Sequence, residues 1–153
     1  MKLPEAQFIR TEITVRDMQL PNDVKLTRKS LVRWLALSVG LISPNESRTS
    51  VLAILSALFH FQLKEKRDPD VHDLLEYLGK GEKVNEKALR YHLFQLKKAG
   101  VIERVKGKYR FTPSPFSEAE DLPSSFEYAY KSRMDIAFVK IKEALAKLKE
   151  LHK

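Results

Sequence analysis

The chain has 153 residues, a length that suits one domain or a small domain with appended elements. Hydrophobic residues make up 43% and charged residues 31%, which excludes a disordered chain. The net charge is +8, and the absence of cysteine excludes disulfides and cysteine-based zinc sites.

No apolar stretch indicates a membrane or secretory segment. The longest candidates, 31–42 and 51–61, are shorter than the roughly 18–20 residues that a bilayer-spanning helix needs. The first ten residues contain no apolar signal region. We therefore expect an intracellular, cytoplasmic protein. Its enrichment in Lys and Glu is typical of proteins from hyperthermophiles.

The N-terminal segment is expected to form a strand and then a helix. Residues 8–15 alternate between apolar and polar side chains, the pattern of a half-buried strand. Residues 20–23 (LPND) break it with turn residues. Thr27 then fits the N-cap of a helix that contains Leu31, Trp34 and Leu35, and Gly40 fits its end.

The next two helices carry most of the predicted core. Residues 43–46 (SPNE) combine a cap serine, a first-turn proline and a glutamate three residues after the cap, so a helix is expected to begin there and run to about Lys66. Its centre, VLAILSALFHF, is apolar almost all round and should be covered on several sides. After Asp68-Pro69, the leucine spacing in 71–78 predicts a short helix that ends at Gly79.

The third helix of this region precedes a predicted β-hairpin. Asn85 fits its N-cap, Gly100 fits its end, and its buried stripe is Leu89, Leu93 and Leu96. Residues 101–105 and 109–111 are β-prone runs around a Lys-Gly-Lys tip. We therefore divide the chain into an N-terminal extension (1–42), a domain (43–112), a proline-rich linker (113–123) and a final helix (124–153).

Positive charge is concentrated in one part of this sequence. Between Lys80 and Arg110 there are ten Lys or Arg against three Glu, a net +7. Residues 1–79 carry only +1, residues 111–130 carry −4, and residues 131–153 carry +4. A localised basic region of this kind is typical of nucleic-acid-binding proteins.

The residue pattern of the basic helix resembles that of a known protein family. The run Arg90-Tyr91-His92-Leu93, followed by Leu96 and by Ala99-Gly100-Val101-Ile102, is similar to the end of the recognition helix in small prokaryotic winged helix-turn-helix transcription regulators. These include the multiple-antibiotic-resistance and arsenical-resistance repressor families. The resemblance covers residues 44–112. It implies a mostly α fold with a small β-hairpin wing, here with an N-terminal extension and a long C-terminal helix.

The resemblance also implies a DNA-binding surface. The third helix would enter the major groove, where Arg90 could pair with guanine and Gln95 with adenine, while the hairpin tip contacts the backbone. Glu86 and Phe94 depart from such a groove-reading face. The alternative is that these positions are ordinary solvated side chains. The candidate DNA-binding residues are Lys80, Lys83, Lys87, Arg90, Tyr91, Gln95, Lys98, Lys106 and Lys108.

The last helix carries an apolar seam at heptad-like spacing. Such a seam fits a helix pair in a homodimer, as in the regulators that the chain resembles, and it equally fits packing on the helix's own domain. A two-fold dimer would read two half-sites about one helical turn apart. The seam consists of Tyr130, Met134, Phe138, Ile141, Leu145 and Leu148.

No pattern indicates catalysis, a metal or a cofactor. His60, His72, His92 and His152 lack metal-ligand spacing, and Asp68, Asp70 and Asp73 fit helix capping better than a metal site. The aromatic residues Trp34, Phe59 and Phe61 fit the core, although they also fit the wall of an effector pocket, for which the sequence specifies no ligand.

The sequence therefore predicts a homodimeric transcription regulator that binds double-stranded DNA and is not an enzyme. Two alternatives remain. One is a winged-helix module that binds another protein, and the other is a sequence-independent accessory domain of a nucleic-acid-processing complex.

Overall fold

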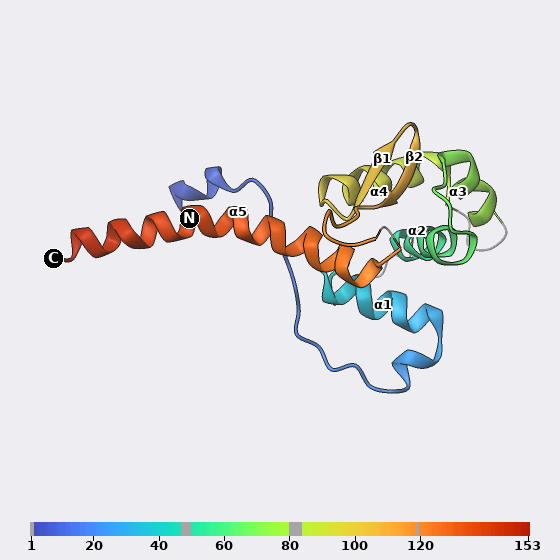
Figure 1. Cartoon of the computed structure of the whole chain (residues 1–153), viewed down its shortest axis with the longest axis horizontal. Coiled ribbons are helices and arrows are strands. Elements are labelled where there is room, and N and C mark those ends of the chain that lie inside the picture. Colours follow the sequence, from blue (N-terminus) through green and yellow to red (C-terminus); the bar gives the residue numbers. More distant parts are fainter. Residues whose placement is uncertain (1, 47–49, 80–83, 119) are drawn as a thin grey trace. The chain divides into compact units, whose positions relative to one another are not determined.

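The computed structural model describes residues 2–46, 50–79, 84–118 and 120–153. The chain divides into two compact units, Met1–Phe111 and Thr112–Lys153. It is mostly helical, with one two-stranded antiparallel sheet, as expected from the sequence (Figure 1). The first unit contains α1 (Arg28–Ser38), α2 (Ser50–Phe59), the π-helical segment η3 (His60–Glu65), α3 (Val71–Leu78), α4 (Glu86–Lys98), β1 (Ile102–Val105) and β2 (Lys108–Phe111), and the second contains α5 (Leu122–Leu151).

The predicted N-terminal strand is wrong. Residues Pro4–Phe8 form a short 3-10 helix, and residues 9–20 are extended without a strand partner among the residues described. Arg16 holds this segment instead: its backbone N–H donates to the Ser38 carbonyl at 2.7 Å, and its guanidinium donates to the carbonyls of Leu37 and Ile42. These carbonyls lie at or just beyond the C-terminus of α1, where a cation is favourable. The alternating pattern therefore marks an extended chain, not a strand.

Helix α1 begins and ends where the sequence predicts. The Thr27 hydroxyl accepts the backbone N–H of Ser30 at 3.1 Å and caps the first turn. At the other end Gly40 has φ +72°, and the N–H of Leu41 donates to the Ala36 carbonyl, which completes a Schellman motif. A side chain at Gly40 would also meet Thr14 Cβ at 2.5 Å, so the glycine lets the N-terminal segment approach closely.

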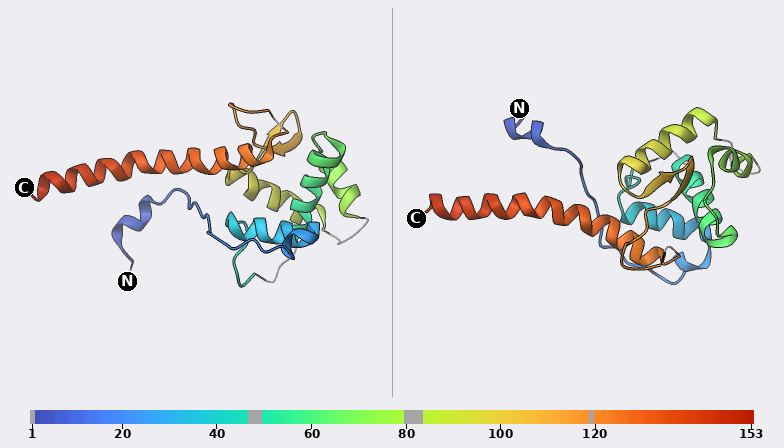
Figure 2. Two further views of the ribbon diagram at one scale, coloured as in Figure 1. Left: turned by 60° about the horizontal axis from the view of Figure 1, so that its bottom comes forward. Right: turned by 45° about the horizontal axis from the view of Figure 1, so that its top comes forward.

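Helix α2 lies at the centre of the first unit, as predicted from its apolar character. It contacts α1, α3 and α4 (Figure 2), and Ile54, Leu55 and Leu58 are fully buried. Its predicted start is wrong, because residues 43–46 form a turn closed by the Glu46 N–H and the Ser43 carbonyl. The helix is described from Ser50, and residues 47–49 lie outside the described part. It continues as η3 and ends at Lys66, which has φ +54°.

Helix α3 begins at a reciprocal capping box. The Asp70 carboxylate accepts the N–H of Asp73 at 2.8 Å, and the Asp73 carboxylate accepts the N–H of Asp70 at 2.9 Å. The N-cap of α3 is therefore Asp70. Asp68 accepts a hydrogen bond from the Gln62 side chain. Capping thus accounts for Asp70 and Asp73, two of the three clustered aspartates.

Helix α5 is continuous over 30 residues. It begins slightly earlier than predicted, because Asp121 rather than Ser124 is the N-cap and accepts the backbone N–H and the hydroxyl of Ser124. These two hydrogen bonds lower the pKa of Asp121. Among the helices in the described residues, none is both long enough and apolar enough to cross a membrane.

Candidate nucleic-acid interface

Helix α4, the predicted recognition helix, is fixed by a cap and by a buried stripe. The Asn85 side chain accepts the N–H of Ala88 at 2.8 Å, as expected for an N-cap. Leu89, Leu93 and Leu96 are buried at helical spacing, as the sequence predicts. Since α4 contacts α2, α3 and β1, its stripe is part of the main core, and its opposite face is left in solvent.

The exposed face of α4 carries the predicted cations. Lys87, Arg90 and Lys98 are all exposed, and so is Gln95. The structure also exposes Lys97, which the sequence did not assign to the site although it sits beside Lys98. Lys80 and Lys83 lie outside the described residues. Among the described residues, α3 ends at Leu78 and α4 begins at Glu86.

Two features of this face limit a simple picture of base reading. Arg90 is already engaged, because its Nε donates to Glu86 Oε2 at 3.1 Å one turn earlier on the helix. Tyr91 and Phe94 remain 57% and 55% exposed, so no described element covers them. His92, which the sequence places at the edge of the core, is half-buried beside the Tyr91 ring.

A second Schellman motif leads from α4 into the hairpin. Gly100 has φ +80° and donates to the Lys97 carbonyl, while the N–H of Val101 donates to the Leu96 carbonyl at 3.1 Å. Val101 is buried, which is the hydrophobic contact that usually accompanies this motif. The chain therefore reverses sharply at the end of α4, and β1 packs against that helix.

The hairpin has a two-residue turn that the sequence alone could not specify. Val105 pairs with Lys108, and both central residues, Lys106 and Gly107, have positive φ, the geometry of a type I′ turn. Lys106 and Lys108 are exposed at this tip, as predicted for a wing. Tyr109 and Phe111 face inward and are buried.

The hairpin contributes one cation that the sequence did not assign to the site. Arg104 is exposed on β1 and lies 5.8 Å from the centre of the Tyr109 ring. Arg104 occupies a polar position in the alternating pattern of the predicted strand, so the sequence could have indicated that it is exposed. Arg110 differs, because its Nε donates to Glu103 at 2.7 Å and its charge is partly neutralised.

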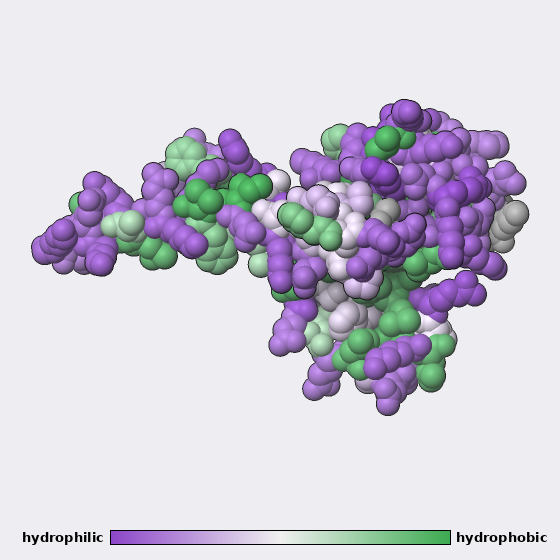
Figure 3. Space-filling model, viewed as in Figure 1, coloured by the Kyte–Doolittle hydropathy of each residue, from purple (hydrophilic) through white to green (hydrophobic). Residues whose placement is uncertain are grey.

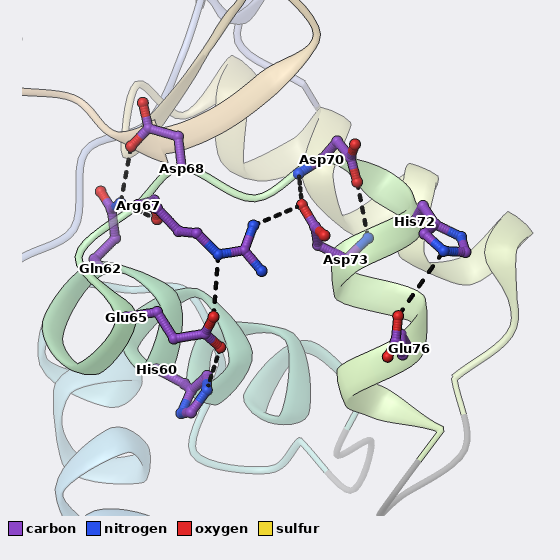
Figure 4. A network of polar contacts seen from close by, with 9 residues as sticks. All are labelled: His60, Gln62, Glu65, Arg67, Asp68, Asp70, His72, Asp73 and Glu76. Carbon is purple, nitrogen blue, oxygen red and sulfur yellow. Dashed lines mark hydrogen bonds and ion pairs between the residues drawn. The ribbon is translucent and has the colours of Figure 1, made fainter.

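A polar network joins η3 to α3 (Figure 4), and one further hydrogen bond joins η3 to the hairpin. Arg67 donates to Glu65 at 3.0 Å and to Asp73 at 3.1 Å, and its guanidinium lies over the Phe61 ring. Gln62 donates to Asp68, and its carbonyl oxygen accepts the N–H of Phe111. The network therefore fixes the base of the hairpin relative to α2 and α3.

Two carboxylates of this network, Glu65 and Asp73, have a lowered pKa. For Glu65, partial desolvation is outweighed by hydrogen bonds from Arg67 and His60, so its pKa is lowered. The N–H of Asp70, together with Arg67, lowers the pKa of Asp73 against the effect of desolvation. Among the described residues, no group of three or more His, Asp or Glu side chains is arranged to hold a metal ion.

The predicted dimerisation seam is buried only at its start. Tyr130 is buried, which raises the pKa of its phenol, and Arg133 lies over its ring at 4.7 Å. Met134 is half-buried. Phe138, Ile141, Leu145 and Leu148 are each 44–59% exposed. Within the described chain, the C-terminal half of the seam therefore has no apolar cover.

Comparison with known proteins adds no relative: no family model, curated protein or solved structure matches this chain.

Proposed function

We propose that this protein binds double-stranded DNA through α4 and the β1–β2 hairpin, and that it acts as a homodimeric transcription regulator of the winged helix-turn-helix type. The observation that carries the proposal is the charge of one continuous described segment. Residues 84–111 contain eight Lys or Arg against two Glu, and the α4 and tip lysines are exposed. Clustered exposed cations on a helix and an adjoining hairpin match the chemistry of a phosphate backbone.

In this proposal the two elements have different roles. Helix α4 has its apolar stripe in the core and a polar, cationic outer face of a size that the major groove accepts. Gln95 and Arg90 on that face are the base-reading candidates, and Arg90 must first leave Glu86. Lys106 and Lys108 contact phosphates from the tip of a turn whose backbone is fixed by its type I′ geometry.

The test is a salt titration of binding to duplex DNA by fluorescence anisotropy. If Lys87, Arg90, Lys98, Lys106 and Lys108 each neutralise one phosphate, log K falls with log salt at a slope of about −4 to −5. Lys106→Ala then makes the slope shallower by about 0.9 and weakens binding to all sequences alike.

Arg90→Ala gives the contrast within the same experiment. It should weaken a selected site more than a random duplex, by about 1–3 kcal/mol, because a base contact carries sequence information. The matched control is Lys25→Glu, an exposed lysine outside the proposed interface, which should change neither slope nor affinity beyond a small factor. Absence of duplex binding at low salt would reject the proposal.

One observation favours a second candidate, a protein-interaction module. Tyr91 and Phe94 are both more than half exposed on the same helix as the cations. Exposed aromatic residues are enriched at protein–protein interfaces, where they act as anchors. If this candidate is correct, Phe94→Ala abolishes capture of an acidic partner, whereas removal of the phosphate-binding lysines only slows association.

A further inference from the structure

A groove separate from the proposed DNA-binding surface lies between α1, α2 and η3, in the first unit. It has a volume of about 900 Å³, at the upper end of the range for small-molecule sites. Its floor is apolar and comes from Leu31 and Leu35 of α1 and from Leu52, Ala53 and Phe59 of α2. Figure 3 shows hydrophobic side chains at the surface over these helices, with hydrophilic ones beside them.

The rim of this groove is basic. Four cations line it: Arg28, Lys29 and Arg33 of α1 and Lys64 of η3. Among the described residues, the lining includes no Asp or Glu. All four cations are exposed, and within the described chain none of them forms an ion pair. An apolar floor beneath an uncompensated basic rim is complementary to an apolar molecule with one anionic end.

The first turn of α1 also favours a ligand with an anionic end. It contains Arg28 and Lys29 and no acidic residue. Cations at a helix N-terminus oppose the helix dipole, where carboxylates or bound anions are the favourable neighbours. Both residues line the groove, so an anion held there would offset an arrangement that is unfavourable in the empty protein.

The far wall of the groove is held in place before any ligand arrives. His60 contacts Glu65 Oε2 at 2.7 Å and stacks on the Tyr77 ring with centres 4.5 Å apart. On the floor, Phe59 stacks on Phe111 of β2, with ring centres 4.8 Å apart. Because these rings are fixed by neighbouring elements, a ligand does not have to order this wall, which lowers the cost of binding.

The exposed seam of α5 from a second copy is a poor occupant of this groove. The C-terminal half of α5 lies in residues 131–153, which carry a net +4. Because the groove lining in the described chain contains four cations and no acidic side chain, that contact would place like charges together. A pair of α5 helices differs, since each carries Asp135, Glu143 and Glu150 as partners for the other's cations. The same repulsion does not apply to a small anion.

We propose that the groove between α1 and α2 is a binding site for a medium-chain monocarboxylate, whose alkyl chain lies on the Leu31–Leu52–Phe59 floor and whose carboxylate pairs with the basic rim of Arg28, Lys29, Arg33 and Lys64. The site shares none of its lining with the α4 and hairpin-tip cations and does not depend on DNA binding.

The test measures binding of decanoate and of n-decanol to the full-length protein by isothermal titration calorimetry, in buffer without nucleic acid. Decanoate should bind the unaltered protein at least about tenfold more tightly than the uncharged alcohol. Arg33→Glu combined with Lys64→Glu should weaken decanoate about tenfold or more and change decanol less than twofold. Lys25→Glu, the same charge reversal at an exposed lysine outside the groove, should leave both unchanged.

A second variant locates the site. Ser56 is a half-buried α2 residue that lines the groove, so Ser56→Trp should fill it and abolish binding of both compounds. Equal affinity for decanoate and decanol, no detectable decanoate binding, or binding that persists in a folded Ser56→Trp variant would each overturn the proposal. If Ser56→Trp does not fold, the variant that combines Arg33→Glu with Lys64→Glu tests the proposal alone, because both side chains are exposed. None of these readouts reports on DNA, so either proposal can fail without the other.

Discussion

At the scale of single residues, Asp73 joins more of the structure than its place on a short helix suggests. Its carboxylate accepts the Asp70 N–H of the capping box and the Arg67 guanidinium. Both partners favour the charged carboxylate, and its pKa is lowered. A group whose folded-state pKa is lowered contributes stability that is present above its unfolded-state pKa and is lost as pH falls through the folded value.

We therefore expect urea-unfolding stability to fall on acidification below about pH 4, and Asp73→Asn to reduce that fall. At pH 7 the same change should cost about 1 kcal/mol, because it weakens the cap and removes the charge that faces Arg67. Circular dichroism at pH 7 and pH 3 measures both effects. Asp135→Asn on the exposed face of α5 is the control. An unchanged pH dependence in Asp73→Asn would show that the network does not stabilise the fold through this group.

At the scale of elements, the hairpin shows how a turn positions a functional tip. Lys106 and Gly107 both have positive φ, a conformation that glycine and asparagine adopt more readily than other residues. An added Cβ at Gly107 meets only a distant arginine nitrogen, so a substitution there tests backbone strain without a steric clash.

Gly107→Ala should therefore lower the free energy of unfolding by about 1–2 kcal/mol, as measured in urea. Lys106→Asn should leave it unchanged or raise it slightly, since asparagine tolerates this backbone conformation, yet it should weaken DNA binding by removal of the charge. The pair separates the structural role of the turn from its proposed phosphate contact. A Gly107→Ala protein as stable as the parent would argue against the type I′ geometry.

At the scale of the whole molecule, oligomeric state decides what the proposed interface can read. The exposed seam positions of α5 occur at the same spacing that predicted a helix pair, and only the start of the seam is buried. A pair of copies would cover these side chains, and the assembly would contain two copies of α4.

We expect the protein to be a dimer by light scattering and to select a palindromic site from random duplexes. Ile141→Glu combined with Leu148→Glu should give a folded monomer, because these positions are exposed in the single chain and their replacement leaves its core intact. Lys142→Glu, on the same exposed stretch but outside the seam, is the control. An unchanged mass for the double variant would reject the helix pair.

Local sequence patterns determined most of the elements of this protein. Helix ends depend on bonds within a few residues, as at the Thr27 and Asn85 caps and at Gly40 and Gly100. The leucine stripe of α4 depends on the spacing along one helical face. Both kinds of feature can therefore be predicted without knowledge of the fold. The concentration of charge near α4 is likewise a property of the sequence. These features predicted α1, α4 and most of the exposed cations near α4, and the β-prone runs on either side of Lys106 and Gly107 predicted the hairpin.

Only the tertiary structure decided features that depend on distant partners. The 8–15 segment has the alternation of a strand, but a strand requires a neighbour, and Arg16 instead ties this chain to the end of α1. The basic rim of the groove likewise comes from cations on α1 and η3 that lie far apart in sequence. Strand pairing, side-chain burial and the shape of a groove arise when separate elements pack together, and a local sequence pattern does not specify that packing.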